Sequence, residues 1–443
     1  MSNYKNLNKK LIKKISEQKK EPPEILDFRL QSFENFQKIA NPSFGPSLKK
    51  LDFKEIFYYV DPHQKLSSEW QQIDTNIQET FQKIGVIDAE DKYLGGLATQ
   101  YESEIVYHNL KKDLQKKGII FTDINGAIQN HYALFKKYFA TLVPNDDNKY
   151  AALNSAVFSG GTFIYIPPNV KLNKPLHAYF RINSKKMGQF ERTLIIVDEN
   201  ASLNYIEGCT APLYSDNALH AAVVEIFLHK NAHCQYITLQ NWSHNVYNLV
   251  TKRAICEANA KMDWIDGNIG SKINMKYPAV ILKGNNSQAK MISMALANSG
   301  QIQDTGAKMI HLGKNTISTI ISKSIIQSQG QANYRGLVKH EKSAINAKSS
   351  INCDTLLLDS KARSNTLPLN IIKNGTSQIN HEATVSAISE EMLYYIMSRG
   401  IDKQVASELV VGGFMESFTK ELPMEYAIEF NDLLKHEMKG AIG

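Results

Sequence analysis

The sequence predicts a mainly β fold, in which a parallel β-helix or a related β-solenoid is flanked by helical regions at both ends. From about residue 155 to residue 385 the chain repeats one pattern with a period near 28 residues. A repeat of this length indicates stacked supersecondary units. Outside that stretch, apolar residues recur at helical spacing. We therefore expect an N-terminal helical region over residues 1–150, a β-helix core over 151–385 and a C-terminal helical region over 386–443.

The N-terminal region contains several segments with helical spacing. Pro22 and Pro23 suit the start of a helix, and Leu26, Leu30 and Phe33 then lie on one helix face. Helical spacing of apolar residues continues in KDLQKKGII and in NGAIQNHYALFKKYFATLV. Paired glycines and prolines after residue 155 mark the change to short β-rich runs.

Each repeat of the core has a β-like run, a short polar corner with one small residue, and a second alternating run, as in RTLIIVDENASLNYIE. We place the corners at Ala201, Ala232, Ala260, Ser287, Thr316, Ala344 and Ala362, at intervals of 31, 28, 27, 29, 28 and 18 residues. One such unit cannot bury its apolar face alone, so the units must stack. A propeller blade would need about 40 residues, and a leucine-rich repeat would need regularly spaced Leu together with Asn, a combination that is absent. Asn and Thr at the corners are expected to bond the turn backbone.

The sequence of the C-terminal region predicts three helices. Ser389 is a natural N-cap and Gly400 a natural C-cap for SEEMLYYIMSRG. Asp402 caps DKQVASELVVGGF, and Pro423 stands early in LPMEYAIEFNDLLKHEM. A helical hairpin cannot sit inside a solenoid coil, so we expect it to pack on the end of the stack or to dock another protein.

Composition excludes several classes of protein. Hydrophobic residues make up 43% and charged residues 21% of the chain, which is ordinary for a globular protein. No apolar stretch approaches the ~20 residues of a membrane-spanning helix, so we expect no membrane insertion. The net charge is +7, but basic residues do not alternate with aromatic ones as in RNA-binding platforms, so nucleic-acid binding is not expected.

The N-terminus is basic but lacks an apolar signal core. We therefore expect a cytoplasmic protein. The plastid stroma is the alternative, because the bias toward Lys, Asn and Ile suggests an AT-rich genome.

The four cysteines are Cys209, Cys234, Cys256 and Cys353, and none belongs to a C-x-x-C motif. Free thiols in a reducing compartment are therefore expected, rather than a self-contained metal site. The string GAKMIHLGKNT is not a P-loop, because six residues separate its glycines and Asn follows the Lys. Dinucleotide-binding, zinc-protease and serine-hydrolase motifs are absent as well. These absences favour a scaffold or binding role over an enzyme.

A combination of motifs resembles the SufB/SufD family, and within it SufB, the scaffold subunit of the SUF iron–sulfur cluster assembly machine. The resemblance is carried by RTLIIVDENASLNYIEGCTAP, LHAAVVEIFLHKNA, TKRAICE, DTGAKMIHLGKNTISTIISK, YRGLV, INCDTLLL and HEAT. EPPEILDFRL near one end and ELPMEYAIEFNDLL near the other are similar to the family too. The resemblance thus covers nearly the whole chain.

The resemblance implies a right-handed parallel β-helix and a scaffold function, in which a cluster is built and then passed to apo-proteins. It implies a complex with SufD and with the SufC ATPase, which would dock on the C-terminal helices and hydrolyse ATP in place of this chain. A homodimer is an alternative to the SufD complex. Sulfur would come from a cysteine desulfurase through SufE or SufU. The cluster would be transient, of the 4Fe–4S or 2Fe–2S type, and reduced flavin is an electron source in some complexes of the family.

The resemblance also implies roles for individual residues. Cys209 in EGC matches the sulfur acceptor. Cys353 in INCD matches the thiolate on which the cluster is built, with Glu382 and His381 of HEAT as further candidate ligands and the remainder supplied by SufD. The residues that match the sulfur path are Arg181 and Asn183 of FRIN, Gln240 and Trp242 of LQNW, and Lys252 of TKRA.

The chemistry of the predicted cluster site fits this assignment. Thiolates hold most iron–sulfur clusters, and imidazole replaces them in some; a carboxylate suits iron entry or a labile ligand. Neighbouring strand residues point to opposite faces, so we expect His381 and Glu382 not to face the same ion. Asn380 and Glu382 should share a face. Many family members have Glu where this chain has Asn380, which removes one carboxylate from the expected iron site.

The predicted sulfur path also has a chemical rationale. A positive group lowers the pKa of a nearby thiol, so we expect Lys252 and Arg181 to favour the persulfide anion. Cys234 and Cys256 follow the pattern of their coils, and we expect them to be structural.

Two other functions stay open at this point. A SufD-like partner would stabilise the complex without nucleating a cluster. A carbohydrate-active β-helix enzyme would need Asp or Glu clustered on one face of the solenoid, and the acidic residues of this chain are scattered.

Overall fold

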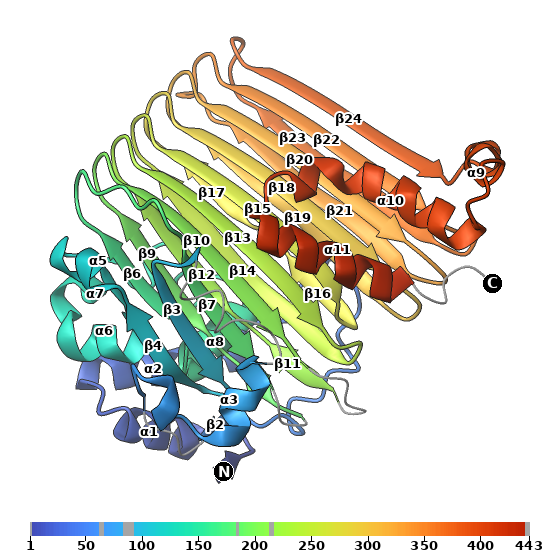
Figure 1. Ribbon diagram of the computed structural model, residues 1–443. Helices are drawn as coiled ribbons and strands as arrows, with labels where there is room; N and C mark the ends of the chain where they lie inside the picture. The colour runs from blue at the N-terminus through green and yellow to red at the C-terminus, as the bar shows by residue number, and fades with distance from the viewer. Residues whose placement is uncertain (1, 62–65, 83–92, 183–185, 212–216, 439–443) are drawn as a thin grey trace.

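The computed structural model describes residues 2–61, 66–82, 93–182, 186–211 and 217–438 (Figure 1). Its core is a parallel β-helix made of two sheets, and helices lie toward both ends of the chain. The predicted fold class is therefore confirmed. None of the described helices combines the length and the apolar character needed to cross a bilayer.

Two large sheets contain nearly all the strands. The first sheet has the spatial order β24 (Gln378–Ala387), β22 (Lys348–Leu357), β20 (Ile317–Ile326), β18 (Gln288–Ala297), β15 (Lys261–Gly270), β13 (His233–Trp242), β10 (Ser202–Thr210), β7 (Leu176–Arg181), β3 (Gly96–Tyr101) and β4 (Glu104–Leu110). The second sheet has the order β23 (Arg363–Ile372), β21 (Gln331–His340), β19 (Ile302–His311), β16 (Ile273–Lys276), β14 (Val246–Cys256), β12 (Val223–Leu228), β9 (Arg192–Val197), β6 (Thr162–Ile166) and β5 (Ile120–Asp123). Short strands β17 (Ala279–Leu282), β11 (Ala218–His220) and β8 (Gly188–Gln189) also belong to the second sheet. A separate antiparallel pair is formed by β1 (Ser2–Tyr4) and β2 (Tyr59–Asp61).

The described helices precede and follow the repeats. On the N-terminal side they are α1 (Lys9–Gln18), α2 (Pro23–Lys38), the 3₁₀ turn η1 (Trp70–Gln72), α3 (Thr75–Gln82), α5 (Lys112–Lys116), α6 (Ile124–Asn130), α7 (Tyr132–Tyr138) and α8 (Lys149–Val157). On the C-terminal side they are α9 (Glu390–Met397), α10 (Lys403–Thr419) and α11 (Met424–Met438). The side chains of Ser389 and Asp402 accept the backbone N–H of Met392 and Val405, so the predicted N-caps of α9 and α10 are confirmed.

The strand register shows which residues of the repeats correspond. Along one corner, the residues that precede the strands of the first sheet are Ala201, Ala232, Ala260, Ser287, Thr316, Ala347 and Ser377. Five predicted corners are therefore correct, and the last two, Ala344 and Ala362, are wrong. Ala344 stands three residues early, because the corner between β21 and β22 is longer than the corners before it. Ala362 belongs to the opposite corner, in register with Gly330, where the chain makes a similar turn.

Asparagines form a ladder along the first of these corners. Asn200, Asn231, Asn259, Asn286, Asn315 and Asn346 all have a φ between 56° and 60°, the left-handed region that Asn tolerates better than most residues. From Asn231 onward, each of these Nδ2 groups donates to the Oδ1 of the previous asparagine, at distances from 2.7 Å to 3.4 Å. Ser287 and Thr316 donate to the carbonyls of Gly284 and Gly313. Corner side chains therefore bond both the turn backbone, as predicted, and one another.

Replacing Asn259 with alanine should destabilise the solenoid. The change removes the bonds to Asn231 and Asn286 and leaves a residue with a β-carbon at φ 57°. We expect the free energy of unfolding to fall by about 1–2 kcal/mol, measured by denaturant titration. Asn259→Gly accepts the same φ, so it should be about 1 kcal/mol more stable than Asn259→Ala. Equal stability of the alanine variant and the parent would contradict this account of the ladder.

The N-terminal region contains strands that its helical spacing did not reveal. The predicted helix over KDLQKKGII ends at Lys116, and Ile120 begins β5. β3 pairs in parallel with β7 and antiparallel with β4, while β5 pairs antiparallel with β6. These strands extend both sheets beyond the first full rung. The predicted segment NGAIQNHYALFKKYFATLV is divided into α6 and α7 at His131.

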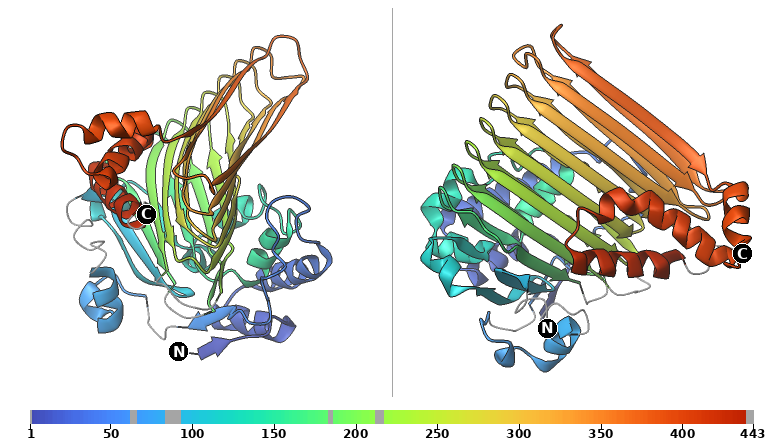
Figure 2. Two further views of the ribbon diagram at one scale, coloured as in Figure 1. Left: turned by 90° about the vertical axis from the view of Figure 1, so that its right-hand side faces the viewer. Right: turned by 45° about the horizontal axis from the view of Figure 1, so that its top comes forward.

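The helices α10 and α11 lie on the outer face of the first sheet, and the two views of Figure 2 agree on this placement. Their apolar side chains Val411, Met415, Phe418, Leu422, Phe430 and Leu434 pack with Ile206, Ile237, Ile265, Ile292 and Met294 of successive rungs. The expected packing on the end of the stack is therefore wrong. Outward-facing isoleucines on successive strands form an apolar stripe across the sheet, and the hairpin covers that stripe instead.

The last rung is left uncovered on its far side. β23 and β24 are the terminal strands of the second and first sheets. Leu367 (42%), Leu369 (55%), Ile372 (50%) and Val385 (53%) are exposed there. Edge strands with exposed apolar residues readily pair with another chain.

Candidate functional site

A thiol, a carboxylate and an ammonium group meet in the interior of the β-helix. Alternate residues of β10 point inward, so Glu207 and Cys209 share the interior face. The Sγ of Cys209 lies 4.0 Å from Glu207 Oε1. The Tyr236 hydroxyl donates to Glu207 Oε2 at 2.6 Å, and Lys252 Nζ lies 3.5 Å from Glu207 Oε1. Lys252 also donates to Thr238 Oγ1 at 2.8 Å.

A second buried ion pair lies deeper in the stack. Lys276 Nζ lies 2.7 Å from Asp266 Oδ1 and donates to Gln240 Oε1 at 2.8 Å. All three side chains are buried. Burial lowers the pKa of Lys276 to about 8, although Asp266 raises it in part. The predicted path residue Gln240 is thus a direct partner of a lysine that the sequence did not single out.

Further hydrogen bonds connect Gln240 to buried polar side chains on earlier rungs of the β-helix. Asn248 Nδ2 donates to Gln240 Oε1 at 2.8 Å. The imidazole of His220 bonds Asn248 at 2.6 Å through Nδ1 and Glu191 at 2.7 Å through Nε2. The Trp242 ring lies against His220, with ring centroids 4.8 Å apart. Gln240, Trp242 and Lys252 therefore all lie in one buried group around the interior beside Cys209.

A column of polar side chains connects this group to Cys353. The interior positions Glu207, Thr238, Asp266, Ser293, Ser322 and Cys353 are in register on six successive strands of the first sheet, and all are buried. Neighbouring strands are about 4.8 Å apart, so these five steps span about 24 Å. Only the last of the six had been selected from the sequence. The other five could have been recognised as polar residues at inward-facing strand positions, but only the strand register shows which positions face inward.

Burial decides the protonation of Cys209. It raises the pKa of the thiol well above its ordinary value, and the carboxylates Glu207 and Glu191 raise it further. Lys252 and Lys276 lower the pKa, but they do not offset burial. Lys252 therefore lowers the pKa of this thiol, as expected, but burial outweighs its effect. The raised pKa favours the protonated thiol.

One of the predicted path residues, Arg181, does not join the interior group. Arg181 is in register with Thr210, the neighbour of Cys209, and its Nη1 donates to Thr210 Oγ1 at 2.9 Å. Because neighbouring strand residues alternate, Arg181 faces the outer side of the first sheet. Its Nε is buried without a hydrogen-bond partner among the described residues. Asn183 lies outside the residues that the structure describes.

Cys353 and His381 face the same interior at the open end of the stack. They stand on neighbouring strands, two positions apart in register. The Tyr334 ring lies perpendicular to the His381 ring, with centroids 6.5 Å apart. The Tyr334 hydroxyl is near enough to Cys353 to affect its pKa, although it makes no hydrogen bond among the described residues. Burial raises the pKa of Cys353 to about 12, and Tyr334 lowers it in part.

The His381 imidazole has a nitrogen available for a ligand. Its Nδ1 lies 3.5 Å from Asn370 Nδ2, whereas its buried Nε2 has no hydrogen-bond partner in the part of the chain described. Burial lowers the pKa of this histidine, which favours the neutral ring that binds metals. A neutral imidazole and a thiol on one face form a partial ligand set for iron.

Glu382 does not join this pair. It is in register with Asn352 on the outer face, where it is exposed, and Asn380 lies on that same face. The predicted alternation of His381 and Glu382 is therefore present in the structure. Within the described residues, no group of three or more His, Cys, Asp or Glu side chains is placed to hold a metal ion. Cys353 and His381 would thus need ligands from elsewhere to complete a cluster.

Comparisons with known proteins show the family to which the chain belongs. Residues 180–414 match the family model described as SUF system FeS cluster assembly, SufBD core domain, and residues 1–178 match the SufBD protein N-terminal region. The chain is 55% identical over 439 residues to the iron-sulfur cluster assembly protein SufB of Bacillus subtilis, which covers 99% of this chain and 94% of that protein. It is 54% identical, with the same coverage, to an iron-sulfur cluster assembly SufBD family protein of Staphylococcus epidermidis. The chain therefore belongs to the SufB/SufD family of iron–sulfur cluster assembly proteins.

Proposed function

We propose that this chain is the scaffold subunit on which the SUF system builds an iron–sulfur cluster. In this proposal Cys209 accepts sulfur, the interior polar column conducts it, and Cys353 with His381 begins the cluster. The observation that carries the proposal is the column, because it connects Glu207, beside Cys209, to Cys353 through buried polar side chains. Buried polar groups cost stability unless they are satisfied. A continuous run of them through a solenoid core therefore favours a function in transport.

The first step is a persulfide exchange. The Cys209 thiolate attacks the terminal sulfur of a donor persulfide, the donor leaves as a thiolate, and the new persulfide stands on Cys209. The thiol must first lose its proton, and Glu207 Oε1, 4.0 Å away, is the nearest described base. Lys252 and Lys276 then stabilise the persulfide anion electrostatically. The donor would be a cysteine desulfurase acting through SufE or SufU.

The second step delivers the sulfur to the open end. In net terms, Cys209 returns to the thiolate and Cys353 carries the persulfide. Iron and electrons then convert this sulfur into a cluster, with reduced flavin as the proposed electron source. Of the predicted path residues, Gln240, Trp242 and Lys252 lie along the route, while Arg181 would act from the outer face near the entrance.

The partner at the open end would be SufD, with a second copy of this chain as the alternative. Cys353 and His381 are too few to hold a cluster, and the strand edges beside them expose Leu367, Leu369 and Val385. A second chain that pairs with β23 or β24 would cover these residues and bring further ligands. Glu382, on the outer face, would serve iron entry rather than hold the finished cluster.

The C-terminal helices are the proposed docking site of SufC. Tyr394 (75%), Leu409 (55%), Met424 (71%) and Ile428 (56%) are exposed on α9, α10 and α11. Exposed apolar side chains in this number on three consecutive helices mark an interaction surface. ATP hydrolysis would then occur in SufC, and the motion would reach the first sheet through the packed face of the hairpin. The proposed location is the cytoplasm, or the stroma if the gene is plastid-encoded.

The proposal is tested by co-expression with SufC and SufD and anaerobic purification. The complex is expected to contain iron and acid-labile sulfide and to show the visible absorbance of a cluster. A complex of intact stoichiometry that stays colourless with iron, cysteine and the desulfurase present would instead support the SufD-like structural role.

A further inference from the structure

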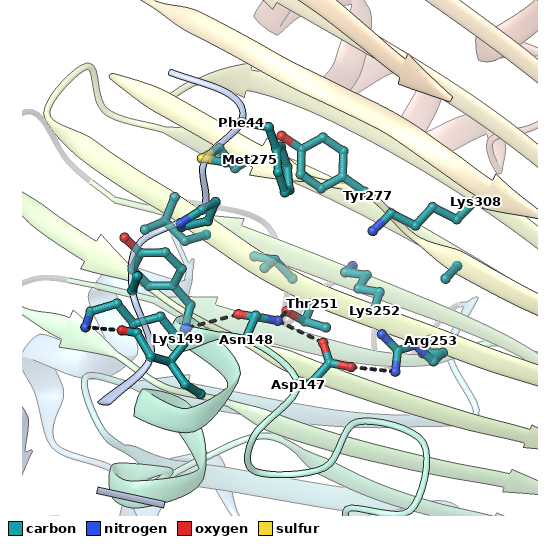
Figure 3. Close-up of a pocket in the computed structure, with 17 residues that line it drawn as sticks. Phe44, Asp147, Asn148, Lys149, Thr251, Lys252, Arg253, Met275, Tyr277 and Lys308 are labelled. Atoms are coloured by element: carbon teal, nitrogen blue, oxygen red, sulfur yellow. Dashed lines mark hydrogen bonds and ion pairs between the residues drawn. The ribbon is translucent and has the colours of Figure 1, made fainter. Parts of the chain in front are cut away.

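A pocket of about 320 Å³ lies on the outer face of the second sheet, opposite the interior network (Figure 3). Its floor is formed by outward-facing residues of β14, β16, β17 and β19. The segment of residues 39–44 that follows α2, and residues 147–150 at the start of α8, form its walls. This volume is at the lower end of the range for small-molecule sites. Neither the sulfur path nor the proposed partner surfaces use this pocket.

The pocket contains a cation, Lys308, that has no carboxylate in direct contact among the described residues. Lys308 has no ion pair or hydrogen bond among the described residues, and its ammonium group lies 5.6 Å from the centroid of the Tyr277 ring. Figure 3 shows its side chain extending toward Tyr277. Burial, together with the nearby charge of Arg253, lowers the pKa of Lys308, and the charge of Asp147 raises it only in part. A partly buried ammonium group without a directly bonded partner is costly, and an anionic ligand would reduce that cost.

The other charged groups of the pocket are already satisfied by the protein. Arg253 Nη1 donates to Asp147 Oδ1 at 2.8 Å and to the Leu142 carbonyl at 2.6 Å. Lys149 Nζ donates to the carbonyls of Phe36 and Ile39. The ammonium of Lys252 bonds Thr238 in the interior and does not enter the pocket. Three cations (Lys149, Arg253 and Lys308) therefore face one carboxylate (Asp147), and that carboxylate is held by Arg253.

Aromatic and apolar side chains form the wall beside Lys308. The rings of Phe44 and Tyr277 meet edge to face, with centroids 5.8 Å apart. Met275 lies beside them, and the Tyr277 hydroxyl is fixed by Asp304 at 2.6 Å. Phe44 is 47% exposed, which is unusual for a phenylalanine, and the Arg335 guanidinium lies 5.7 Å from the centroid of its ring.

From these contacts we propose that the pocket binds a small organic anion with a flat apolar body, namely an aromatic or heteroaromatic carboxylate or phosphate. The anionic group would pair with Lys308, and the ring would lie against Phe44 and Tyr277. Carboxylate and phosphate share the chemistry that Lys308 recognises, so the experiment must separate them. This site is independent of the proposed scaffold function, because its side chains lie on the other face of the sheet.

The test measures binding of four probes to the full-length chain by saturation-transfer NMR and calorimetry. The probes are phenyl phosphate, benzoate, inorganic phosphate and benzyl alcohol. At least one of the two aromatic anions is expected to bind. The anion that binds more tightly shows whether the pocket prefers a phosphate or a carboxylate. Inorganic phosphate, which lacks the ring, and benzyl alcohol, which lacks the charge, are both expected to bind at least tenfold more weakly. Equal binding of benzyl alcohol and the aromatic anions would overturn the proposal.

Matched variants locate the binding to this pocket. Lys308→Gln should weaken the aromatic anion by about ten- to a hundredfold, because it removes a charge-assisted contact. Lys283→Gln makes the same charge change at an exposed position outside the pocket and should leave binding unchanged. Phe44→Ala should weaken the aromatic anions and leave inorganic phosphate unaffected. Unchanged affinity in Lys308→Gln, in a variant whose unfolding transition matches the parent, would overturn the site. Cluster assembly in the SUF complex is scored separately, so failure here leaves the scaffold proposal intact.

Discussion

Replacing Cys353 with serine is expected to abolish cluster assembly in the complex with SufC and SufD. The serine hydroxyl keeps the shape of the side chain but does not supply a thiolate, and thiolates hold most iron–sulfur clusters. After anaerobic purification, the iron and acid-labile sulfide of the variant complex should fall close to those of a sample prepared without iron. The visible absorbance of the cluster should disappear with them.

Cys256→Ser is the matched control for this change. Cys256 is also buried and faces the interior, but it lies at the far end of β14, away from the open rung. We expect its complex to keep the cluster. A cluster of full occupancy in Cys353→Ser would remove Cys353 from the assembly site, and loss in both variants would point to folding rather than ligation.

Cys209→Ser is expected to prevent persulfide acceptance, which is the second large effect. With desulfurase, its sulfur-transfer partner and cysteine present, the parent chain should gain one sulfane sulfur at Cys209, measured by mass spectrometry of the alkylated peptide. Because burial and Glu207 raise the pKa of this thiol, its thiolate fraction is small at neutral pH and increases as the pH rises. The initial rate of acceptance should therefore increase between about pH 7 and pH 9.

Cys234→Ser is the control here, since Cys234 stands on the neighbouring strand and faces the same interior. It should accept sulfur at Cys209 at the rate of the parent chain. A rate that stays constant over this pH range would show that deprotonation of Cys209 does not limit the reaction. Sulfur uptake lost equally in both serine variants would assign the defect to packing.

The repeat could be predicted from the sequence because stacking imposes one pattern on every rung. Asn200, Asn231, Asn259, Asn286 and Asn315 occupy one corner in register, so the small residue after each of them marks the same turn. The predicted corner Ala344 was wrong because the corner before β22 is longer than the others. The predicted corner Ala362 was wrong because both corners of a rung contain a small residue. The strands β3 to β5 were missed because they pair with the sheet ends and do not repeat.

The candidate site could be predicted only in part. The motif positions identified Cys209, Gln240, Trp242, Lys252, Cys353 and His381, and the structure places all six on the interior of the solenoid. The polar residues between them, such as Asp266, Ser293 and Ser322, required the register, since each looks like an ordinary strand residue in isolation. The net pKa of Cys209 also required the structure, because burial outweighs the two lysines.

The central claim is that sulfur travels from Cys209 to Cys353, and isotope-labelled cysteine tests it most directly. The desulfurase and its transfer partner would load the SufC–SufD complex in the absence of iron and reductant, and persulfide on each cysteine peptide would be followed by mass spectrometry. Label is expected on Cys209 first and on Cys353 later, and Cys353 should stay unlabelled in Cys209→Ser. Label reaching Cys353 in Cys209→Ser at the rate of the parent complex would contradict the account.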